Sequence, residues 1–489
     1  MIKRGNAATQ SALAHPIKVL QYGEGNFLRA FVDYMLDIAN EKTDFNGSVV
    51  LVKPIAFGEL SAFHKQDCRY TVLLRGLVDG KPVEASRLVT AVTDAVDAYG
   101  EYEKYAAYAR LESLRFIVSN TTEAGIVLDE SDRFELCPPN TYPGKLCKLL
   151  YERAVAFDYA QDKGLVMLPV ELIEDNGIEL KRCVKRLARL WKLGERFEQW
   201  LESACVFTST LVDRIVTGYP KEEAEAIWQK LGYEDHLLVT GEPFALWVIE
   251  SEKDLSQELP LPACGLPVIY TNNQKPYKQR KVRILNGAHT SFVPAAFLCG
   301  YDFVLDAMND PLIKTFMQQT LYEEVIPTLT LPKEDLIAFA SAVTGRFENP
   351  YIKHALLSIC LNCVSKWRAR CLPSLLGYVE LRRELPQRLT FSLAAVMALY
   401  YGGTLQNGEL VCERAGKPYV LRDDAPVLAF FAEHASTPAP ELARLYLANA
   451  AFFGQDLTLV PGLLSSVSES LQAILSRGMR VVMSEKFGG

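Results

Sequence analysis

Short apolar runs alternate with helical patterns through the first half of the chain. The apolar runs at residues 17–21, 48–52, 115–118 and 164–168 predict buried strands. Between the first two, apolar residues recur at helical spacing from Leu28 to Ala39, which predicts a helix with one buried face that ends near Asn40. Alternating strands and helices are typical of an α/β sheet.

The pattern changes near residue 271. Beyond it, helical periodicity dominates, and Pro and Gly separate helices rather than strands. The polar run at residues 272–276 is the best candidate boundary. The pattern therefore predicts an N-terminal α/β domain, residues 1–275, and a mostly α-helical C-terminal domain, residues 276–489.

Composition narrows the class of protein. The 489 residues are 49% hydrophobic and carry a net charge of −7, which fits a globular protein and argues against nucleic acid as a partner. Eleven cysteines at irregular spacing are typical of reduced thiols. Residues 1–16 lack the apolar core of a signal peptide, and the apolar stretch 389–401 is too short to span a membrane. We expect a cytoplasmic protein without a membrane partner.

A glycine pair follows the first predicted strand. Gly23 and Gly25 flank Glu24 and precede the first helix, as in a loop that holds the pyrophosphate of a dinucleotide at a helix N-terminus. The third small residue of that fingerprint is replaced by Leu28. An ordinary glycine turn is the alternative, but the position between strand and helix favours dinucleotide binding. The candidate cofactor-binding residues are Gly23, Gly25, Asn26, Phe27, Leu28 and Arg29.

The second predicted strand does not decide between NAD and NADP. An acidic residue that binds the adenosine ribose is expected at its end, but the chain has Lys53 there and no carboxylate before Glu59. Lys53 could attract a 2′-phosphate, or it could be a solvated lysine, which is the more common case. The residues alone leave the choice of cofactor open.

Three polar residues open the helical half. If residues 281–289 are helical, Lys281, Asn286 and His289 share one face, at about 0°, 140° and 80° around the axis. A lysine base, an amide donor and an imidazole suit proton transfer at a hydroxyl group. A helix start with a solvated lysine and a buried histidine is the simpler alternative. The histidines show no metal-ligand spacing, so no metal site is expected.

The Lys-x4-Asn-x2-His spacing after a GxGxF loop resembles the polyol-specific long-chain dehydrogenase family, which includes mannitol dehydrogenases. Five further segments are similar to the branch of that family that interconverts tagaturonate and altronate. The resemblance covers nearly the whole chain. The five segments are residues 118–126, 142–146, 168–177, 210–216 and 346–350.

The resemblance implies a Rossmann-type dinucleotide-binding domain, a helical substrate-binding and catalytic domain, NAD as cofactor and no metal. It implies that Lys281 is the general base, that Asn286 donates to the reacting oxygen, and that His289 binds substrate and lysine. Mannitol dehydrogenases carry a second asparagine where this chain has Leu172, which fits a different substrate, such as one with a carboxylate. The candidate cations for that group are Arg214, Lys366, Arg368 and Arg370.

The function implied by the resemblance is the interconversion of D-tagaturonate and D-altronate with NAD(H), so the expected partner is a small sugar acid. Within the family, a fructuronate/mannonate or mannitol dehydrogenase is the alternative. Outside enzymes, the alternative is a dinucleotide-binding regulatory protein that kept the fold and lost the chemistry. The sequence does not set the oligomeric state.

Overall fold

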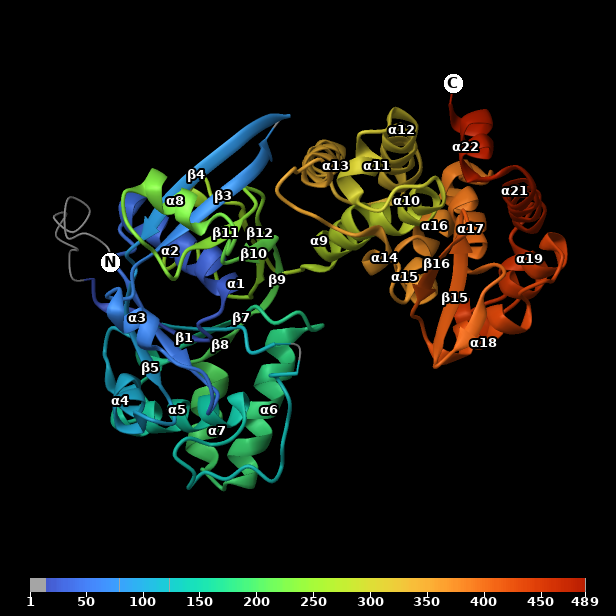
Figure 1. Ribbon diagram of the computed structural model, residues 1–489. Helices are drawn as coiled ribbons and strands as arrows, with labels where there is room; N and C mark the ends of the chain where they lie inside the picture. The colour runs from blue at the N-terminus through green and yellow to red at the C-terminus, as the bar shows by residue number, and fades with distance from the viewer. Residues whose placement is uncertain (1–14, 79, 123, 489) are drawn as a thin grey trace. The chain divides into compact units, whose positions relative to one another are not determined.

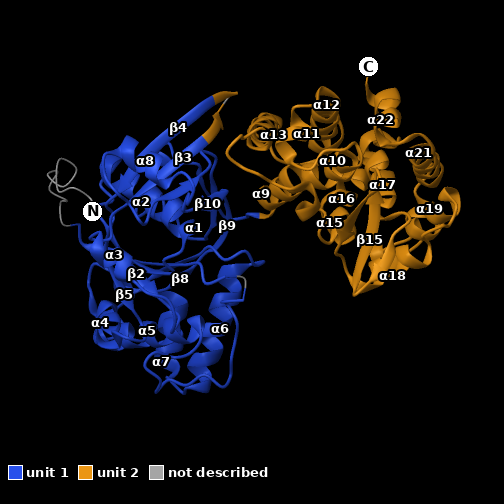
Figure 2. Cartoon of the chain, viewed as in Figure 1, with its two compact units in different colours: residues 1–75, 82–274 blue, residues 76–81, 275–489 orange. Residues whose placement is uncertain are grey.

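The computed structural model describes residues 15–78, 80–122 and 124–488 (Figure 1). Residues 1–14, on which the expectation about a signal peptide largely depends, lie outside the described residues. The chain forms two compact units (Figure 2). Unit 1 comprises Met1–Arg75 and Pro82–Gln274, and unit 2 comprises Gly76–Lys81 and Lys275–Gly489.

A six-stranded parallel sheet forms the centre of unit 1. Its strand order is β5-β2-β1-β6-β7-β8, so the chain winds outward from β1 in both directions. This is the order of a Rossmann fold. The strands are β1 (Ile17–Tyr22), β2 (Ser48–Lys53), β5 (Val92–Asp97), β6 (Phe116–Ser119), β7 (Val166–Pro169) and β8 (Val206–Phe207). The predicted Rossmann-type domain is confirmed, and the four predicted strands match β1, β2, β6 and β7 to within two residues.

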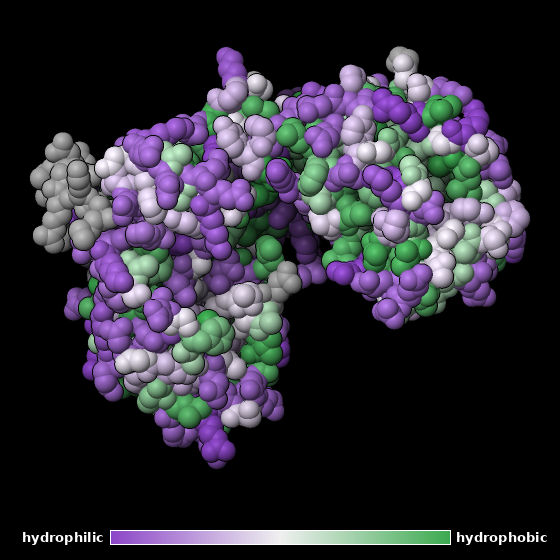
Figure 3. Space-filling model, in the orientation of Figure 1, coloured by the Kyte–Doolittle hydropathy of each residue, from purple (hydrophilic) through white to green (hydrophobic). Residues whose placement is uncertain are grey.

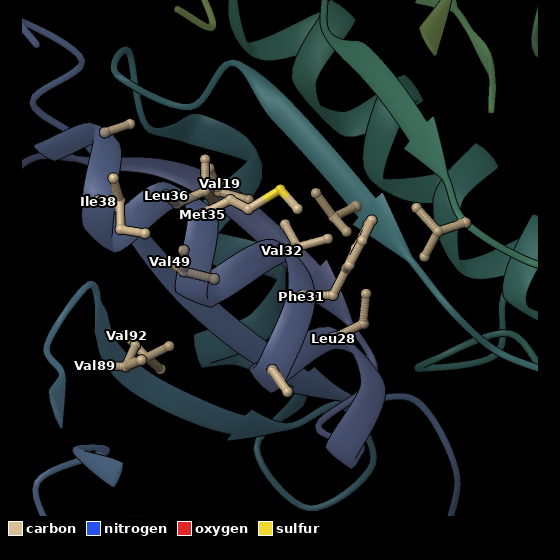
Figure 4. Packing of buried hydrophobic residues seen from close by; sticks show 14 of the residues in the cluster. Val19, Leu28, Phe31, Val32, Met35, Leu36, Ile38, Val49, Val89 and Val92 are labelled. Atoms are coloured by element: carbon tan, nitrogen blue, oxygen red, sulfur yellow. The ribbon is translucent and has the colours of Figure 1, made fainter. Parts of the chain in front are cut away.

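Both faces of this sheet are buried. Val49 and Leu51 of β2 belong to one apolar cluster, whereas Val50 and Val52 belong to another, as the two-residue period of a strand requires. On the first face lies a continuous helix made of α1 (Asn26–Leu28), η1 (Arg29–Asp33) and α2 (Tyr34–Lys42), whose apolar side chains pack toward Val19 and Val49 (Figure 4). The second face is covered by α4 (Tyr102–Ala107), α5 (Tyr142–Ala156), α6 (Asn176–Leu190) and α7 (Glu195–Ser203).

Two smaller sheets complete unit 1. One has the order β10-β11-β3-β4 and the other β13-β12-β9. The sequence pattern also predicts strands at residues 70–78, 82–89 and 268–271, which match β3, β4 and β13 to within one residue, whereas β9, β10, β11 and β12 were not predicted. The elements are α3 (Ser61–Lys65), β3 (Tyr70–Val78), β4 (Lys81–Val89), η2 (Tyr108–Arg110), η3 (Gln161–Lys163), β9 (Ser209–Asp213), β10 (Val216–Gly218), α8 (Ala224–Leu231), β11 (Val239–Gly241), β12 (Leu246–Glu250), η4 (Pro262–Cys264) and β13 (Val268–Thr271).

Unit 2 is mostly helical, as predicted. Its centre is α17 (Gln387–Tyr400), which is buried over almost its whole length and packs against α10 (Gly287–Leu298) and α21 (Leu463–Arg477). One three-stranded antiparallel sheet was missed, although Asn407-Gly408 and Ala415-Gly416 mark its turns. Its strands are β14 (Thr404–Gln406), β15 (Glu409–Arg414) and β16 (Lys417–Leu421).

The remaining helices of unit 2 are α9 (Lys275–Arg280), η5 (Lys281–Asn286), α11 (Val304–Met308), α12 (Pro311–Gln319), η6 (Thr320–Val325), η7 (Ile326–Thr328), α13 (Lys333–Phe347), α14 (Leu356–Ile359), α15 (Cys363–Arg370), α16 (Leu372–Arg382), α18 (Ala425–Glu433), α19 (Ala439–Leu447), α20 (Ala450–Phe453), η8 (Leu457–Leu459) and α22 (Met479–Phe487). Hydrophilic residues cover most of the visible face of each unit (Figure 3). Among the described residues, no helix combines the length and the apolar character needed to cross a membrane.

Asn176 connects β7 to β9. Its side chain is buried, and its Nδ2 donates to the backbone oxygens of Pro169, Glu171 and Thr210 at 3.1 Å each. Its Oδ1 accepts from the backbone N–H of Thr210 at 2.9 Å. One amide therefore satisfies backbone groups from the loop after β7 and from a strand of a different sheet.

We expect Asn176→Ala to lower the free energy of unfolding by about 2–4 kcal/mol, because several buried backbone groups lose their partner. Urea denaturation of the full chain measures this change. Asn309→Ala, at an exposed position after α11, is the control and should change stability by less than about 0.5 kcal/mol. Equal stability of the two variants would contradict the bridging role of Asn176.

Candidate functional site

The glycine loop follows β1 directly. Gly23 has φ +118°, and a Cβ atom there would lie 3.1 Å from the backbone oxygen of Asn120, so this position requires glycine. Gly25 has φ −68° and ψ 164°, and a Cβ atom there would meet nothing within 4 Å. Space is therefore open beside Gly25, at the start of the helix.

The loop lies where dinucleotides bind in this kind of sheet. β1 is paired with β2 on one side and with β6 on the other, and the strand order reverses at β1 and β6. Ligands of open parallel sheets bind outside the carboxyl ends of the strands at this point. Gly25 is the N-cap of α1, and no side chain caps that end, so helix N–H groups remain for an anionic ligand. These residues fit the pyrophosphate of a dinucleotide.

Arg29 holds the loop in place from inside the protein. It is only 7% exposed, and its guanidinium donates to Asn26 Oδ1 at 2.6 Å and to the backbone oxygens of Glu24 and Leu237. The guanidinium also lies 5.1 Å from the centre of the Tyr70 ring. The side chain of Arg29 thus supports the loop.

The other candidate cofactor-binding residues differ in how far they are exposed to solvent. Gly25 and Asn26 are exposed, and Phe27 is half-buried and stacks on Phe31 with ring centres 5.0 Å apart. Leu28 is 1% exposed and belongs to the core of unit 1. A contact of Leu28 with a cofactor therefore needs its backbone, because its side chain faces the core.

Lys53 is not the solvated lysine that its position at a strand end suggested. It is 1% exposed and forms an ion pair with Asp97, with 3.0 Å between Nζ and Oδ2. That interpretation is therefore wrong: β2 is buried on both faces, and its last residue is paired with the last residue of β5.

Lys281, Asn286 and His289 lie in one continuous helix formed by α9, η5 and α10. Residues 281–286 form a π-helical segment, in which hydrogen bonds join residues five apart. Lys281 and Asn286 are therefore about one full turn apart, so their side chains leave the helix on nearly the same side. An α-helix would place them about 140° apart around its axis. Asn286 and His289 are three residues apart, at the junction with α10. The π-helical segment thus brings Asn286 closer to the side of the helix that carries Lys281.

His289 lies among aromatic and cationic side chains. Its ring centre is 4.0 Å from that of Phe347 and 5.4 Å from that of His354. Burial lowers the pKa of His289 well below its usual value, and the positive charges of Arg346, Arg370 and Lys366 lower it further. The imidazole is therefore neutral at physiological pH. Its buried Nε2 has no hydrogen-bond partner among the described residues, which fits a contact with a bound ligand.

The four candidate cations have different surroundings. Arg214 is buried in unit 1 and donates to the backbone oxygens of Ala30, Pro243 and Phe244, so it supports the fold. Arg368 is exposed on α15.

The other two candidates, Lys366 and Arg370, lower the pKa of His289. Lys366 and Arg370 lie one turn apart on α15, and Arg370 Nη1 donates to Thr290 Oγ1, beside His289, at 3.3 Å. Both are among the groups that lower the pKa of His289 most.

Two family models match the chain. The mannitol dehydrogenase Rossmann domain matches residues 17–263, and the mannitol dehydrogenase C-terminal domain matches residues 273–475. The chain belongs to the mannitol dehydrogenase family. The expectation of an oxidoreductase of this family is therefore confirmed.

The family's curated members include close relatives of this chain. An altronate oxidoreductase of Yersinia pestis bv. Antiqua is 46% identical over 478 residues, which cover 96% of this chain and 97% of the relative. An altronate oxidoreductase of Escherichia coli O7:K1 is 47% identical over 473 residues, which cover 95% of this chain and 96% of the relative. The predicted similarity to this branch of the mannitol dehydrogenase family is confirmed.

Two solved structures share the fold. D-Sorbitol dehydrogenase in its substrate-free form has a TM-score of 0.77 at 21% identity and covers 96% of this chain and 95% of its own. Mannitol 2-dehydrogenase of Pseudomonas fluorescens, in a ternary complex with NAD and D-mannitol, has a TM-score of 0.65 at 22% identity and covers 96% and 94%.

Three residues near His289 were not singled out from the sequence: Arg346, Phe347 and His354. The first two lie in the segment 346–350 that resembles the mannitol dehydrogenase family, so a signal was present without an assigned role. His354 had no such signal, because its position beside His289 depends on the packing of the segment after α13.

The two glycines of the loop give a paired prediction. Gly25→Ala should leave thermal stability unchanged, because the backbone angles suit alanine and the methyl group meets open space. The same methyl group should raise the Kd for NADH at least about tenfold, because it keeps the pyrophosphate from the backbone. Fluorescence titration with NADH measures this.

Gly23→Ala is the comparison, since φ +118° and the Asn120 oxygen should make it lose stability as well as NADH affinity. Unchanged NADH affinity in Gly25→Ala would exclude the proposed role of the loop.

Proposed function

We propose that the chain is a cytoplasmic enzyme that interconverts D-tagaturonate and D-altronate with NAD(H). The relatives named altronate oxidoreductase support this substrate at 46–47% identity over nearly the whole chain. In this proposal residues 1–275 bind the dinucleotide, and residues 276–489 bind the sugar acid and carry the catalytic groups.

The observation that carries the proposal is the charge around His289. Three of the side chains that lower the pKa of its imidazole are cationic: Arg346 on α13, and Lys366 and Arg370 on α15. A neutral polyol needs no such charge, whereas a uronate carries a carboxylate that must find a cation when it leaves water. Arg370 and Lys366 are the best candidates, because both are partly buried and lie one turn apart.

In the proposed mechanism one residue transfers the proton and two others orient the substrate. Residues 1–275 would hold NAD(H), which would supply the hydride acceptor for oxidation and the hydride donor for reduction. Lys281 takes the hydroxyl proton at its Nζ, and Asn286 donates its amide N–H to the same oxygen. Neutral His289 can accept or donate one hydrogen bond through Nε2, which suits orientation of the substrate. The lowered pKa of His289 favours Lys281 as the proton carrier, since an imidazole that stays neutral is a poor acid.

A substrate panel tests the function. Tagaturonate, fructuronate and fructose, each with NADH, are followed at the nicotinamide absorbance. We expect the highest kcat/KM for tagaturonate. Equal kcat/KM for tagaturonate and fructose would exclude a uronate-specific enzyme and favour a polyol dehydrogenase, while higher activity with fructuronate would favour mannonate oxidation. NADH binding without turnover of any sugar would favour a regulatory protein.

Two arginines on α15 give a matched pair of variants. Arg370→Gln should reduce kcat/KM for the keto-uronate about 10- to 100-fold, because a charge-assisted hydrogen bond contributes about 1.5–3 kcal/mol. The neutral fructose should lose much less. Arg368→Gln removes the same charge from the exposed side of the same helix and should leave both rates unchanged. A similar loss for both sugars would assign Arg370 to the fold rather than to the carboxylate.

Lys281→Ala should lower kcat about 10²–10⁴-fold, the usual contribution of general acid–base catalysis. Its Kd for NADH should change little, and a small amine in the buffer should restore part of the activity. His289→Ala should lose less activity and should not respond to amines. Steady-state kinetics with and without methylamine make the comparison. Near-normal turnover by Lys281→Ala would exclude Lys281 as the base.

A further inference from the structure

The end of β2 lacks the acid that commonly binds the adenosine ribose, and a buried lysine stands there instead. Lys53 Nζ donates to the backbone oxygens of Ile55 at 3.0 Å and Phe57 at 3.4 Å, and it pairs with Asp97 Oδ2 at 3.0 Å. A lysine ammonium has three hydrogens, and these three acceptors account for them. Lys53 therefore has no hydrogen left for a 2′-phosphate.

Asp97 is the last residue of β5, and the parallel register pairs it with Lys53. Its carboxylate thus lies at the carboxyl edge of the sheet, one strand away from the usual acid. Its side chain is 28% exposed, so the carboxylate is accessible to a ligand. Oδ1 accepts from the backbone N–H of Tyr99 at 2.9 Å, and Oδ2 accepts from Lys53. Each carboxylate oxygen can accept a second hydrogen bond.

Asp97 is ionised at neutral pH. Burial acts to raise its pKa, but the hydrogen bonds from Lys53 and from backbone N–H groups outweigh burial and leave the pKa below its usual value. Glu24, between the two glycines of the pyrophosphate loop, acts electrostatically on both Lys53 and Asp97. Because the Lys53–Asp97 pair is neutral overall, Glu24 makes the local charge negative when it is ionised. Such a site suits neutral hydroxyl groups and repels a phosphate.

We propose that the Asp97 carboxylate accepts hydrogen bonds from the adenosine ribose hydroxyls of NAD(H), in place of the acid missing from the end of β2, and that Lys53 is the positioning residue that holds it there. The proposal rests on the proposed function for its cofactor, and it adds the residue that selects NAD(H) over NADP(H).

Binding without any sugar tests this directly. Wild-type protein is titrated with NADH and with NADPH, and Kd is measured by nicotinamide fluorescence. We expect NADH to bind at least about tenfold more tightly than NADPH. Asp97→Asn should raise the Kd for NADH about 10- to 100-fold and the Kd for NADPH much less, so that the preference for NADH over NADPH falls. Tighter binding of NADPH to the wild type, or equal losses for both cofactors in Asp97→Asn, would overturn the proposal.

Asp94→Asn is the matched control. Asp94 lies on the same strand, its side chain is 29% exposed, and it pairs with Lys104 at 2.8 Å. Its position three residues before the carboxyl edge keeps it away from the proposed site. The control should leave both dissociation constants unchanged, and a shift in the NADH/NADPH ratio equal to that of Asp97→Asn would overturn the assignment to Asp97.

A second measurement does not depend on the stability of the variant. AMP and 2′-deoxy-AMP are compared on the wild type as competitors of NADH. AMP should bind about tenfold more tightly, because only AMP offers the 2′-hydroxyl. In Asp97→Asn this difference should disappear. Equal binding of the two nucleotides to the wild type would overturn the proposal. Normal NADH binding with no sugar turnover would instead contradict the proposed function and leave the role of Asp97 intact.

Discussion

Parallel pairing of six strands, buried on both faces, is the constraint on which the rest of unit 1 depends. Parallel strands end at one edge, so residues that follow β1, β2, β5 and β6 meet there even though they are far apart in sequence. The glycine loop, Lys53 and Asp97 all lie at this edge. Because the sheet is covered on both sides, a charge at its end must find a partner within the protein, and Lys53 finds Asp97.

Unit 2 uses a different device to place its polar groups. The helix that carries Lys281, Asn286 and His289 changes from α- to π-helical hydrogen bonding over residues 281–286 and returns to α at Gly287. A π-helical segment is less stable than an α-helix and is found frequently at functional sites. The helix after the glycine loop contains a similar segment, η1. Both candidate sites thus lie on or next to a helix whose turn is widened.

The sequence pattern predicted the parts of this protein that depend on local order. Apolar runs located β1, β2, β6 and β7, because a strand buried on both faces is apolar at nearly every position. Helical spacing located the first helix, because a helix buried on one face repeats its apolar residues every three or four positions. The three-residue strands β10 and β11 leave almost no such pattern. The similarity to the mannitol dehydrogenase family supplied candidate residues, but it could not separate Arg214, which supports the backbone of unit 1, from Arg370, which lies beside His289. That distinction depends on tertiary contacts.

Lys53 shows where the limit lies. A lysine at the end of a strand is usually solvated, and the residues around it contain no nearby acid in sequence. Its partner comes from 44 positions further along the chain and is set by the register between β2 and β5. The charge at this edge of the sheet therefore depends on which residues the pairing of β2 with β5 brings together. A fingerprint that covers only β1 and β2 contains the positively charged Lys53 and no acid. In the folded sheet Lys53 is paired with Asp97, and the exposed member of this pair is the Asp97 carboxylate.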